Sequence, residues 1–182
     1  LKAKAMTLPL LIEDEQAGID ELERRIQRLV AAAKELINEE PALAASFQHL
    51  QAAKGVGEAT ALAILGELEV LPDCLRAPQV VRYAGLDVRH TESGTSVSRP
   101  GRLSKAGNVY LRSALYMPAL TAVRYDPVVK AFYESLLARG KRKLQALCAV
   151  MRKYLMGLWA CLKTQQPFDS RLLFASVPGE NG

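Results

Sequence analysis

The first forty residues carry a heptad pattern of apolar side chains, which restricts this part of the chain (residues 1–40) to one long helix. Pro41 ends the pattern after roughly three to four repeats. A helix with such a stripe needs a partner: either the chain's own helices cover it, or a second copy pairs with it as a coiled coil that sets the oligomeric state. Glu15 falls at one core position and weakens the second arrangement without removing it. The apolar positions are Ile12, Ile19, Leu22, Ile26, Leu29, Ala33 and Leu36.

Positive charge is concentrated in the middle of the chain. The net charge is +5, but residues 82–153 alone carry 14 Lys and Arg against 4 Asp and Glu. A basic block confined to one part of a chain is typical of proteins with a polyanion partner. Because Gly, Ser, Thr and Asn are interleaved with these cations, backbone and hydroxyl donors can also approach phosphates. We therefore favour nucleic-acid binding over an ordinary solvated basic surface.

The rest of the apolar pattern predicts a mainly α-helical fold. With 182 residues and 49% hydrophobic side chains, the chain can build one ordinary core and an accessory element. We expect a helical domain over residues 41–165 and a peripheral tail over residues 166–182. After the heptad segment, helices are predicted over residues 43–53, 62–68, 79–84, 104–125, 127–140 and 141–163.

Polar caps and prolines define several of these helix ends. Ser104 is the expected N-cap of the helix that runs to Tyr125, with a bend at Pro118. Asp126 and Pro127 supply the cap and the first-turn proline of the next helix.

The last predicted helix is apolar but does not fit a membrane span. Arg152, Lys153 and Gly157 interrupt it, and its uncharged runs are too short to cross a bilayer. Its core candidates are Leu144, Leu147, Val150, Leu155, Leu158, Trp159 and Leu162. The three cysteines, odd in number and without metal-like spacing, indicate buried thiols in a reducing cytoplasm. They are Cys74, Cys148 and Cys161.

Two glycines one residue apart lie between helical patterns, near residues 50–68. Gly55 and Gly57 allow a tight turn with positive φ and leave the first N–H groups of the next helix open to an anion. With Lys54 before them and Thr60 after them, they resemble the helix-hairpin-helix motif, which grips DNA phosphates without reading sequence. An ordinary helix–helix turn is the alternative.

Residues 85–103 show no sustained period and are predicted to form a long irregular loop with room for short strands. Loops of this length are uncommon unless they are functional or disordered. The loop carries Ser93 among cations that can act as phosphate donors. These cations and their neighbour in the following helix are Arg89, Arg99, Arg102, Lys105 and Arg112.

The residues alone do not single out one serine in this region. Ser96 and Ser98 lie close to Ser93, and a serine in a glycine-rich loop is commonly a turn former. His90 fits a base or a phosphate donor, but also an exposed histidine without function.

Asn108 and Arg112 lie four residues apart and therefore share one helix face near its N-terminus. Both can reach the same strand of nucleic acid. Local capping and solvation is the competing interpretation.

The order of these features resembles the C-terminal half of the insertion-sequence transposases that work as bridge-RNA-guided serine recombinases. The likeness covers residues 50–165, roughly. Its most specific part runs from Ser93-Gly94 through Ser104-Lys105-Ala106-Gly107-Asn108 to Leu111-Arg112. Gly55-Val56-Gly57 and Tyr83-Ala84-Gly85-Leu86 precede that part in the expected order.

The resemblance implies a two-part protein of which this chain holds the coiled-coil segment and the transposase domain. In that family an N-terminal RuvC-like domain carries four metal-binding acidic residues, and the C-terminal domain carries a nucleophilic serine, which falls on Ser93. It implies attack of that hydroxyl on a DNA phosphodiester and a covalent phosphoserine intermediate. We expect no cofactor in this chain and Mg²⁺ in the RuvC-like domain. The start at Leu1 rather than Met fits a part of a longer protein.

The implied partners are DNA, a guide (bridge) RNA and further copies of the chain, in the bacterial cytoplasm at the nucleoid and without a membrane. The chain alone is expected to bind without turnover. One alternative is a non-catalytic helix-hairpin-helix module that binds and spaces nucleic acid. A small serine hydrolase is a weaker alternative, because the segment around Ser93 lacks the Gly-x-Ser-x-Gly elbow.

Overall fold

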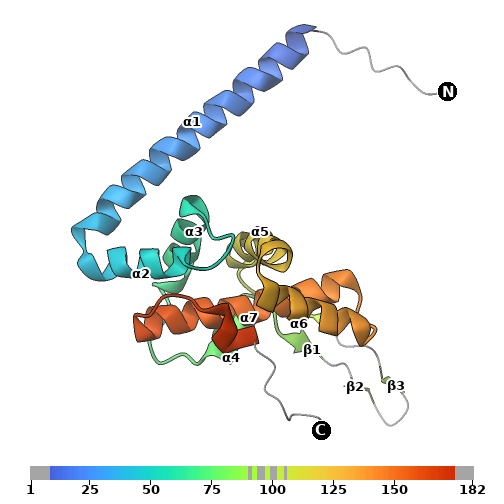
Figure 1. The fold of residues 1–182 in the computed structure, drawn as a ribbon. Helices are drawn as coiled ribbons and strands as arrows, with labels where there is room; N and C mark the ends of the chain where they lie inside the picture. Colours follow the sequence, from blue (N-terminus) through green and yellow to red (C-terminus); the bar gives the residue numbers. More distant parts are fainter. Residues whose placement is uncertain (1–8, 90–91, 94–96, 99–101, 105, 175–182) are drawn as a thin grey trace, which may run out of the picture.

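The structure, a computed structural model, describes residues 9–89, 92–93, 97–98, 102–104 and 106–174 (Figure 1). The described chain is mainly helical, as the sequence predicts, with four strands of two residues each. The helices are α1 (Pro9–Glu39), α2 (Pro41–Gln51), α3 (Glu58–Leu68), α4 (Ala77–Tyr83), α5 (Val109–Tyr125), α6 (Pro127–Ala138), α7 (Lys143–Thr164) and α8 (Ser170–Phe174). The strands are β1 (Val88–Arg89), β2 (Glu92–Ser93), β3 (Val97–Ser98) and β4 (Arg102–Leu103).

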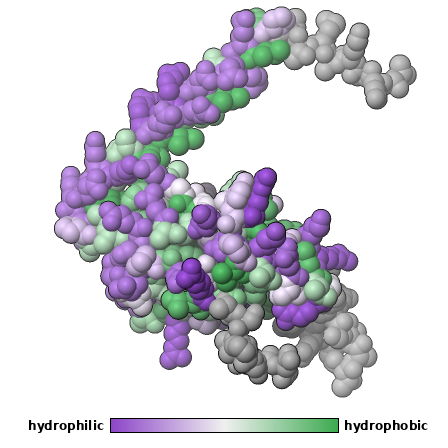
Figure 2. Space-filling view, viewed as in Figure 1, coloured by the Kyte–Doolittle hydropathy of each residue, from purple (hydrophilic) through white to green (hydrophobic). Residues whose placement is uncertain are grey.

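Helix α1 projects from the rest of the molecule, and none of its residues is buried (Figure 1). It contacts α2 and α3 near its C-terminal end, where Ile37 packs against the core and Lys34 Nζ lies 2.5 Å from Glu58 Oε1. The apolar stripe stays exposed, with Ile26 at 54% and Leu29 at 63% of their full accessible surface. Figure 2 shows apolar side chains along this helix. Within the described chain, therefore, no helix covers the stripe.

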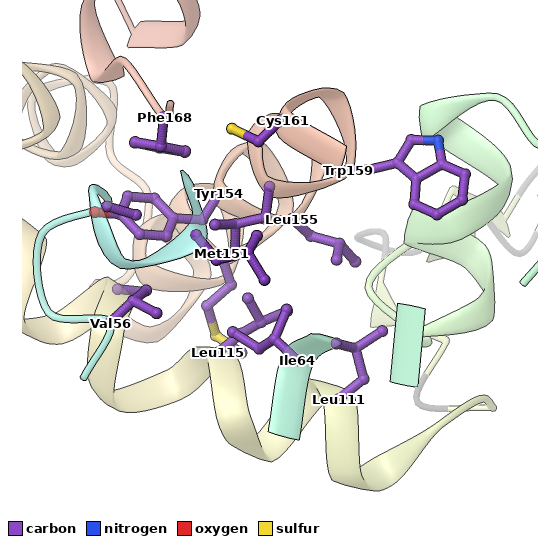
Figure 3. Close-up of a cluster of buried hydrophobic side chains, with 14 of the residues drawn as sticks. Val56, Ile64, Leu111, Leu115, Met151, Tyr154, Leu155, Trp159, Cys161 and Phe168 are labelled. Carbon is purple, nitrogen blue, oxygen red and sulfur yellow. The ribbon is translucent and has the colours of Figure 1, made fainter. Parts of the chain in front are cut away.

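Helix α7 forms the centre of the helical body, and α2, α4, α5, α6 and α8 pack around it. Tyr154, Leu155 and Leu158 on α7 are fully buried, and Figure 3 shows the first two within the apolar cluster. The Tyr154 hydroxyl donates to the Lys54 carbonyl at 2.8 Å, and Trp159 Nε1 donates to the Leu75 carbonyl at 3.1 Å. Both polar atoms thus have partners inside the core, as buried donors require.

Two titratable side chains of α7 are strongly affected by this burial. Desolvation raises the pKa of the Cys161 thiol to about 11, against a smaller opposing effect of a backbone hydrogen bond. Desolvation, assisted by the Asp126 carboxylate, also raises the pKa of Tyr154. Both groups are therefore protonated in the folded protein near neutral pH.

The sequence prediction for α7 and the tail needs three corrections. Leu144, a predicted core residue, is 63% exposed because it lies in the first turn of α7, beyond the core. Phe168 and Phe174, in the predicted peripheral tail, are buried against α7, where Gly157 leaves room for the Phe168 ring. Cys74, predicted to be buried, is exposed.

Most predicted helix ends agree with the structure to within a turn. Pro41 and Pro127 each begin a helix, and Asp126 Oδ1 accepts hydrogen bonds from the N–H groups of Val128 and Val129. Ser104 is the exception, because α5 begins five residues later and its N-cap is Asn108. No described helix is long and apolar enough to span a bilayer.

Candidate nucleic-acid interface

Within the predicted irregular loop, the described strands β1, β2, β3 and β4 pair as two short antiparallel ladders, which we call the β-arm (Figure 1). β1 pairs with β4, Val88 opposite Leu103 and Arg89 opposite Arg102. β2 pairs with β3, Glu92 opposite Ser98 and Ser93 opposite Val97. Ser93, the candidate nucleophile, therefore lies on the last described rung of the arm, and the backbone register sets its position.

The foot of the arm is fastened to α4 through main-chain contacts. Ser104 N donates to the Asp87 carbonyl at 2.9 Å, and Asn108 N donates to the Tyr83 carbonyl at 2.7 Å. Gly107 lies so close to that carbonyl that a Cβ at this position would clash with backbone atoms of Tyr83 and Gly85. The Gly-Asn pair therefore holds the return strand against the end of α4.

Asn108 links three elements beneath the arm. Its Oδ1 accepts from Leu111 N at 2.9 Å, which caps α5, while its Nδ2 donates to Tyr83 Oη at 2.9 Å and to Glu67 Oε2. Arg112 Nη1 donates to the Ala84 carbonyl at 2.8 Å. The geometry thus displays the capping and packing contacts that the sequence analysis left as the alternative to nucleic-acid binding by Asn108 and Arg112.

Two further features at the foot of the arm were not found from the sequence. Asp87 Oδ1 is buried without a hydrogen-bond partner among the described residues, although Asp87 reads as an ordinary loop acid in the sequence. An open hollow also lies here, between α4 and residues 106–108. No periodicity in the sequence could have revealed it, because it is formed by two segments that are distant in the sequence. Its lining residues are Gln79, Arg82, Tyr83, Ala106, Gly107 and Asn108.

The Gly55–Gly57 turn lies in the six-residue connection, 52–57, that joins α2 to α3. Gly55 has a φ of +88° and packs against Pro118 and Thr121 of α5, while Val56 is buried in the core. Gly57 is the N-cap of α3, and the first intrahelical hydrogen bond runs from Ala61 N to the Gly57 carbonyl. The turn therefore offers the N-terminal end of α3 to the surface.

The candidate residues of this turn differ in exposure. Lys54 is exposed and Thr60 is half-buried. Glu58, in the first turn of α3, pairs with Lys34 of α1. The ion pair reduces the repulsion that the carboxylate would exert on a phosphate at this helix end.

The structure places the remaining predicted residues only in part. Arg89 and Arg102 are described through their backbone, which sets two arginine positions on one rung. His90, Arg99 and Lys105 lie outside the described residues. No group of His, Cys, Asp and Glu in the described chain is arranged to hold a metal ion.

Comparison with known proteins shows which families and relatives the chain is similar to. Residues 47–134 match the sequence profile described as the Transposase IS116/IS110/IS902 family. The chain is 32% identical to the pilin gene-inverting protein of Moraxella bovis over 157 residues, which cover 85% of this chain and 46% of that protein. The pilin gene-inverting protein of Moraxella lacunata is 34% identical over 140 residues, covering 76% of this chain and 43% of the relative.

A third relative is the insertion element IS110 uncharacterized 43.6 kDa protein of Streptomyces coelicolor. It is 30% identical over 118 residues, 65% of this chain and 29% of the relative. The chain thus spans less than half the length of each of these relatives. The matched residues 47–134 contain the Gly55–Gly57 turn, the β-arm and α5. Over residues 47–134, therefore, the chain is similar to transposases of the IS116/IS110/IS902 family.

Proposed function

We propose that this domain acts on DNA during transposition of an insertion sequence, with Ser93 as the nucleophile and a guide RNA selecting the site. The observation that carries the proposal is the position of Ser93 on the last described rung of a β-arm inside the family match. Such an arm carries one residue away from the helical body, toward a large substrate, while its foot stays fixed to α4. A duplex needs this kind of access, because its phosphates cannot enter a closed pocket.

The proposed step forms one bond and breaks one bond at phosphorus. Ser93 Oγ attacks a phosphodiester, the serine proton passes to a base, and the sugar oxygen leaves and takes up a proton. The hydroxyl of a second DNA end then attacks the phosphoserine, which restores the serine and joins the two DNA segments. A serine hydroxyl needs activation for this attack, and the charge on the phosphate needs donors already in place.

The basic residues of the arm are the proposed donors. Arg89 and Arg102 occupy opposite positions of one rung. We assign both arginines to the DNA phosphates. Arg99, Lys105 and His90 belong to the same segment of sequence and are assigned the same role. Lys54, Gly55, Gly57 and Thr60 form the second proposed phosphate contact, at the N-terminal end of α3.

Partners and metal follow from the same resemblance. The exposed stripe of α1 is the proposed contact between copies of the chain. Mg²⁺ is assigned to a RuvC-like domain outside this chain, and no step here passes through a metal. A bacterial cytoplasmic location at the nucleoid, and binding without turnover by this chain alone, complete the proposal.

The test compares three serines in the full-length protein. Ser93→Ala is expected to abolish strand exchange while complexes with DNA and RNA still form. Ser96→Ala and Ser98→Ala, which remove hydroxyls from the same arm, are expected to keep most of the activity. Full recombination by Ser93→Ala would remove Ser93 from the mechanism, and loss in Ser96→Ala alone would transfer the role to that residue.

The second candidate is a non-catalytic helix-hairpin-helix module that binds and spaces nucleic acid, favoured by the turn at Gly55 and by the start of α3, where Gly57 makes no side-chain cap hydrogen bond. It predicts steeply salt-dependent binding, because Lys and Arg release counterions from phosphates. It also predicts no covalent adduct. Trapping a phosphoserine–DNA species with the full-length protein would decide against this candidate.

A further inference from the structure

We propose that the turn between α6 and α7 is a third nucleic-acid contact, which holds the phosphate backbone at a place separate from the β-arm and from the N-terminal end of α3. The inference rests on the proposed function, because it assumes that the chain binds nucleic acid. The turn lies beyond residues 47–134, the part that matches the family profile. In the view of Figure 1 it lies toward the right-hand end of the helical body, the end at which β2 and β3 are drawn.

The α6–α7 turn carries four cations within five residues, Arg139, Lys141, Arg142 and Lys143, and all four are exposed. None of them forms an ion pair with a described residue. No Asp or Glu occurs between residues 135 and 168 of the sequence. The positive charge of the turn is therefore not neutralised by nearby acidic residues of the same segment.

The backbone of the turn is closed by its own hydrogen bonds. Gly140 has a φ of +79°, its N–H donates to the Leu137 carbonyl at 2.9 Å, and Lys141 N donates to the Leu136 carbonyl at 3.1 Å. Arg142 N donates to Gln145 Oε1 at 3.0 Å. These bonds form a helix C-cap followed directly by a helix start. The four cations therefore project from a fixed backbone, so less order has to be gained when a ligand binds.

Three of the four charges are placed unfavourably for the protein alone. Lys141, Arg142 and Lys143, beside the start of α7, face the positive end of its helix dipole, where acidic side chains are normally preferred. Arg139 differs, because it is the C-cap of α6 and its Nε donates to the Ser135 carbonyl at 3.3 Å. Four like charges in five residues also repel one another, and a polyanion offsets this cost as well as the dipole cost.

The density of the charges favours a phosphate backbone over an acidic protein segment. Five extended residues span at most about 17 Å, a length over which duplex DNA presents about ten charges, at one per ~1.7 Å. A duplex can thus neutralise all four cations at once. DNA and RNA share this chemistry.

The experiment uses the whole 182-residue chain and removes these four charges together. The variant R139Q/K141Q/R142Q/K143Q is compared with R24Q/R25Q/R28Q/R171Q, which lowers the net charge equally at exposed positions on α1 and α8. Affinities for 20-bp DNA and RNA duplexes are measured by fluorescence anisotropy between 50 and 400 mM salt. The charge-keeping pair Arg139→Lys and Arg142→Lys tests whether charge alone is required.

The first variant is expected to bind at least tenfold more weakly at 150 mM salt. Its slope of log affinity against log salt is expected to fall by about two to four, near 0.9 per lost phosphate contact. The matched control is expected to change the slope by less than one, and the charge-keeping pair is expected to retain it. A loss with DNA, with RNA or with both supports the inference and shows which backbone the turn holds.

Three results would overturn the inference. The first is an unchanged slope in the four-charge variant while the unmodified chain binds. The second is an equal loss in the matched control. The third is that the unmodified chain binds a poly-glutamate peptide as tightly as it binds the duplexes, which would show a general attraction to polyanions. Failure of the unmodified chain to bind any duplex would instead refute the proposed nucleic-acid binding, and Ser93→Ala tests the chemistry separately.

Discussion

Gly55 and Gly57 are separated by one residue in the same turn, yet they differ in backbone conformation and in packing. Gly55 adopts a positive φ and lies against Pro118 and Thr121, so a side chain there meets both a strained backbone and a filled space. Gly57 has a φ of −83°, and nothing lies within 4 Å of the place where its Cβ would be. Only the first glycine is required by the packing of α5 on the turn.

Gly55→Ala is expected to lower the free energy of unfolding by about 1–3 kcal/mol, since the left-handed backbone and the contact with Thr121 both oppose a Cβ. Urea unfolding measures the change. Gly66→Ala is the control, because Gly66 is exposed in the last turn of α3 with open space around it. That substitution is expected to stabilise the protein by about 0.5–1 kcal/mol. Equal effects of the two substitutions would contradict this account of Gly55.

Cys161 is expected to make stability fall above pH 9. Its pKa is about 11 in the folded protein against 9.0 in the unfolded chain, so the unfolded state loses its proton first. The stabilising contribution is complete below pH 9 and is lost as the pH rises through 11. Tyr154, whose pKa is also raised, adds to the fall above pH 10.

Thermal unfolding between pH 7 and 11 tests this sign. The midpoint of Cys161→Ala is expected to depend less on pH than that of the unmodified chain. Cys74→Ala, which removes an exposed thiol, should leave the dependence unchanged. If the unfolding midpoint instead increases as the pH is raised past 9, the direction of the pKa shift assigned to the buried Cys161 thiol is wrong.

Among the elements, α5 shows most clearly where sequence reasoning succeeds and where it fails. Ser104 and Asn108 are both good N-cap residues, and the local sequence favours neither strongly. The choice is made by contacts with α3 and α4: Gly107 fits against the Tyr83 carbonyl, and Asn108 reaches Glu67. Ser104, Gly107 and Asn108 contact residues 83–87, so the helix begins only after them.

Asn108→Asp separates the two roles of this side chain. The carboxylate can still accept the hydrogen bond of Leu111 N, but it cannot donate to Glu67 and repels that carboxylate. We expect the free energy of unfolding to fall by about 1–3 kcal/mol at neutral pH, because the half-buried hydrogen bond to the Glu67 carboxylate is broken. Asn108→Ala removes the cap as well as the donor.

The two variants differ in their pH dependence. Asn108→Asp is expected to regain stability below about pH 4, where the introduced carboxyl takes up a proton and can donate again, whereas Asn108→Ala is expected to stay destabilised. Urea unfolding at pH 7 and pH 4 makes the comparison. Unchanged stability of Asn108→Asp at pH 7, beside a clear loss in Asn108→Ala, would show that the cap alone accounts for the role of Asn108.

Other elements show the same division between local and tertiary information. Pro41 and the Asp126-Pro127 pair set helix ends by local geometry, so the sequence predicts them correctly. The strands of the arm have two residues each, too few for an alternating pattern to be visible. Leu144 continues the apolar period of α7 by one turn past the edge of the core, and only the packing of the neighbours shows where that edge lies.

For the whole molecule, the notable feature is the contrast between a closed core and an uncovered α1. The helical body buries its apolar residues, including Phe168 and Phe174 near the C-terminal end, and nothing in the described chain covers the α1 stripe. A helix of this kind gains most of its stability from a partner. Of the two arrangements left open by the sequence, packing on the chain's own described helices is not the one observed.

Ile26→Glu is expected to shift the chain toward the monomer, because it places a charge in the middle of the exposed stripe. Sedimentation velocity gives the mass, and circular dichroism should show a loss of helix from α1. The midpoint of unfolding of the body is expected to stay nearly unchanged, since α1 buries no residue in the core. Gln27→Glu adds the same charge next to the stripe and should leave the mass unaltered. An unmodified chain that is monomeric at all concentrations would refute pairing through α1.

Helix α1 has 31 residues and, at about 1.5 Å per residue, measures about 47 Å. If two copies join along it, the direction of the join decides how widely their serine arms are separated. Helices running the same way bring both bodies to one end, suited to neighbouring sites. Helices running opposite ways hold the bodies a full helix length apart, near 14 base pairs of duplex at ~3.4 Å each. The length of α1 would then set the distance between the two proposed points of strand exchange.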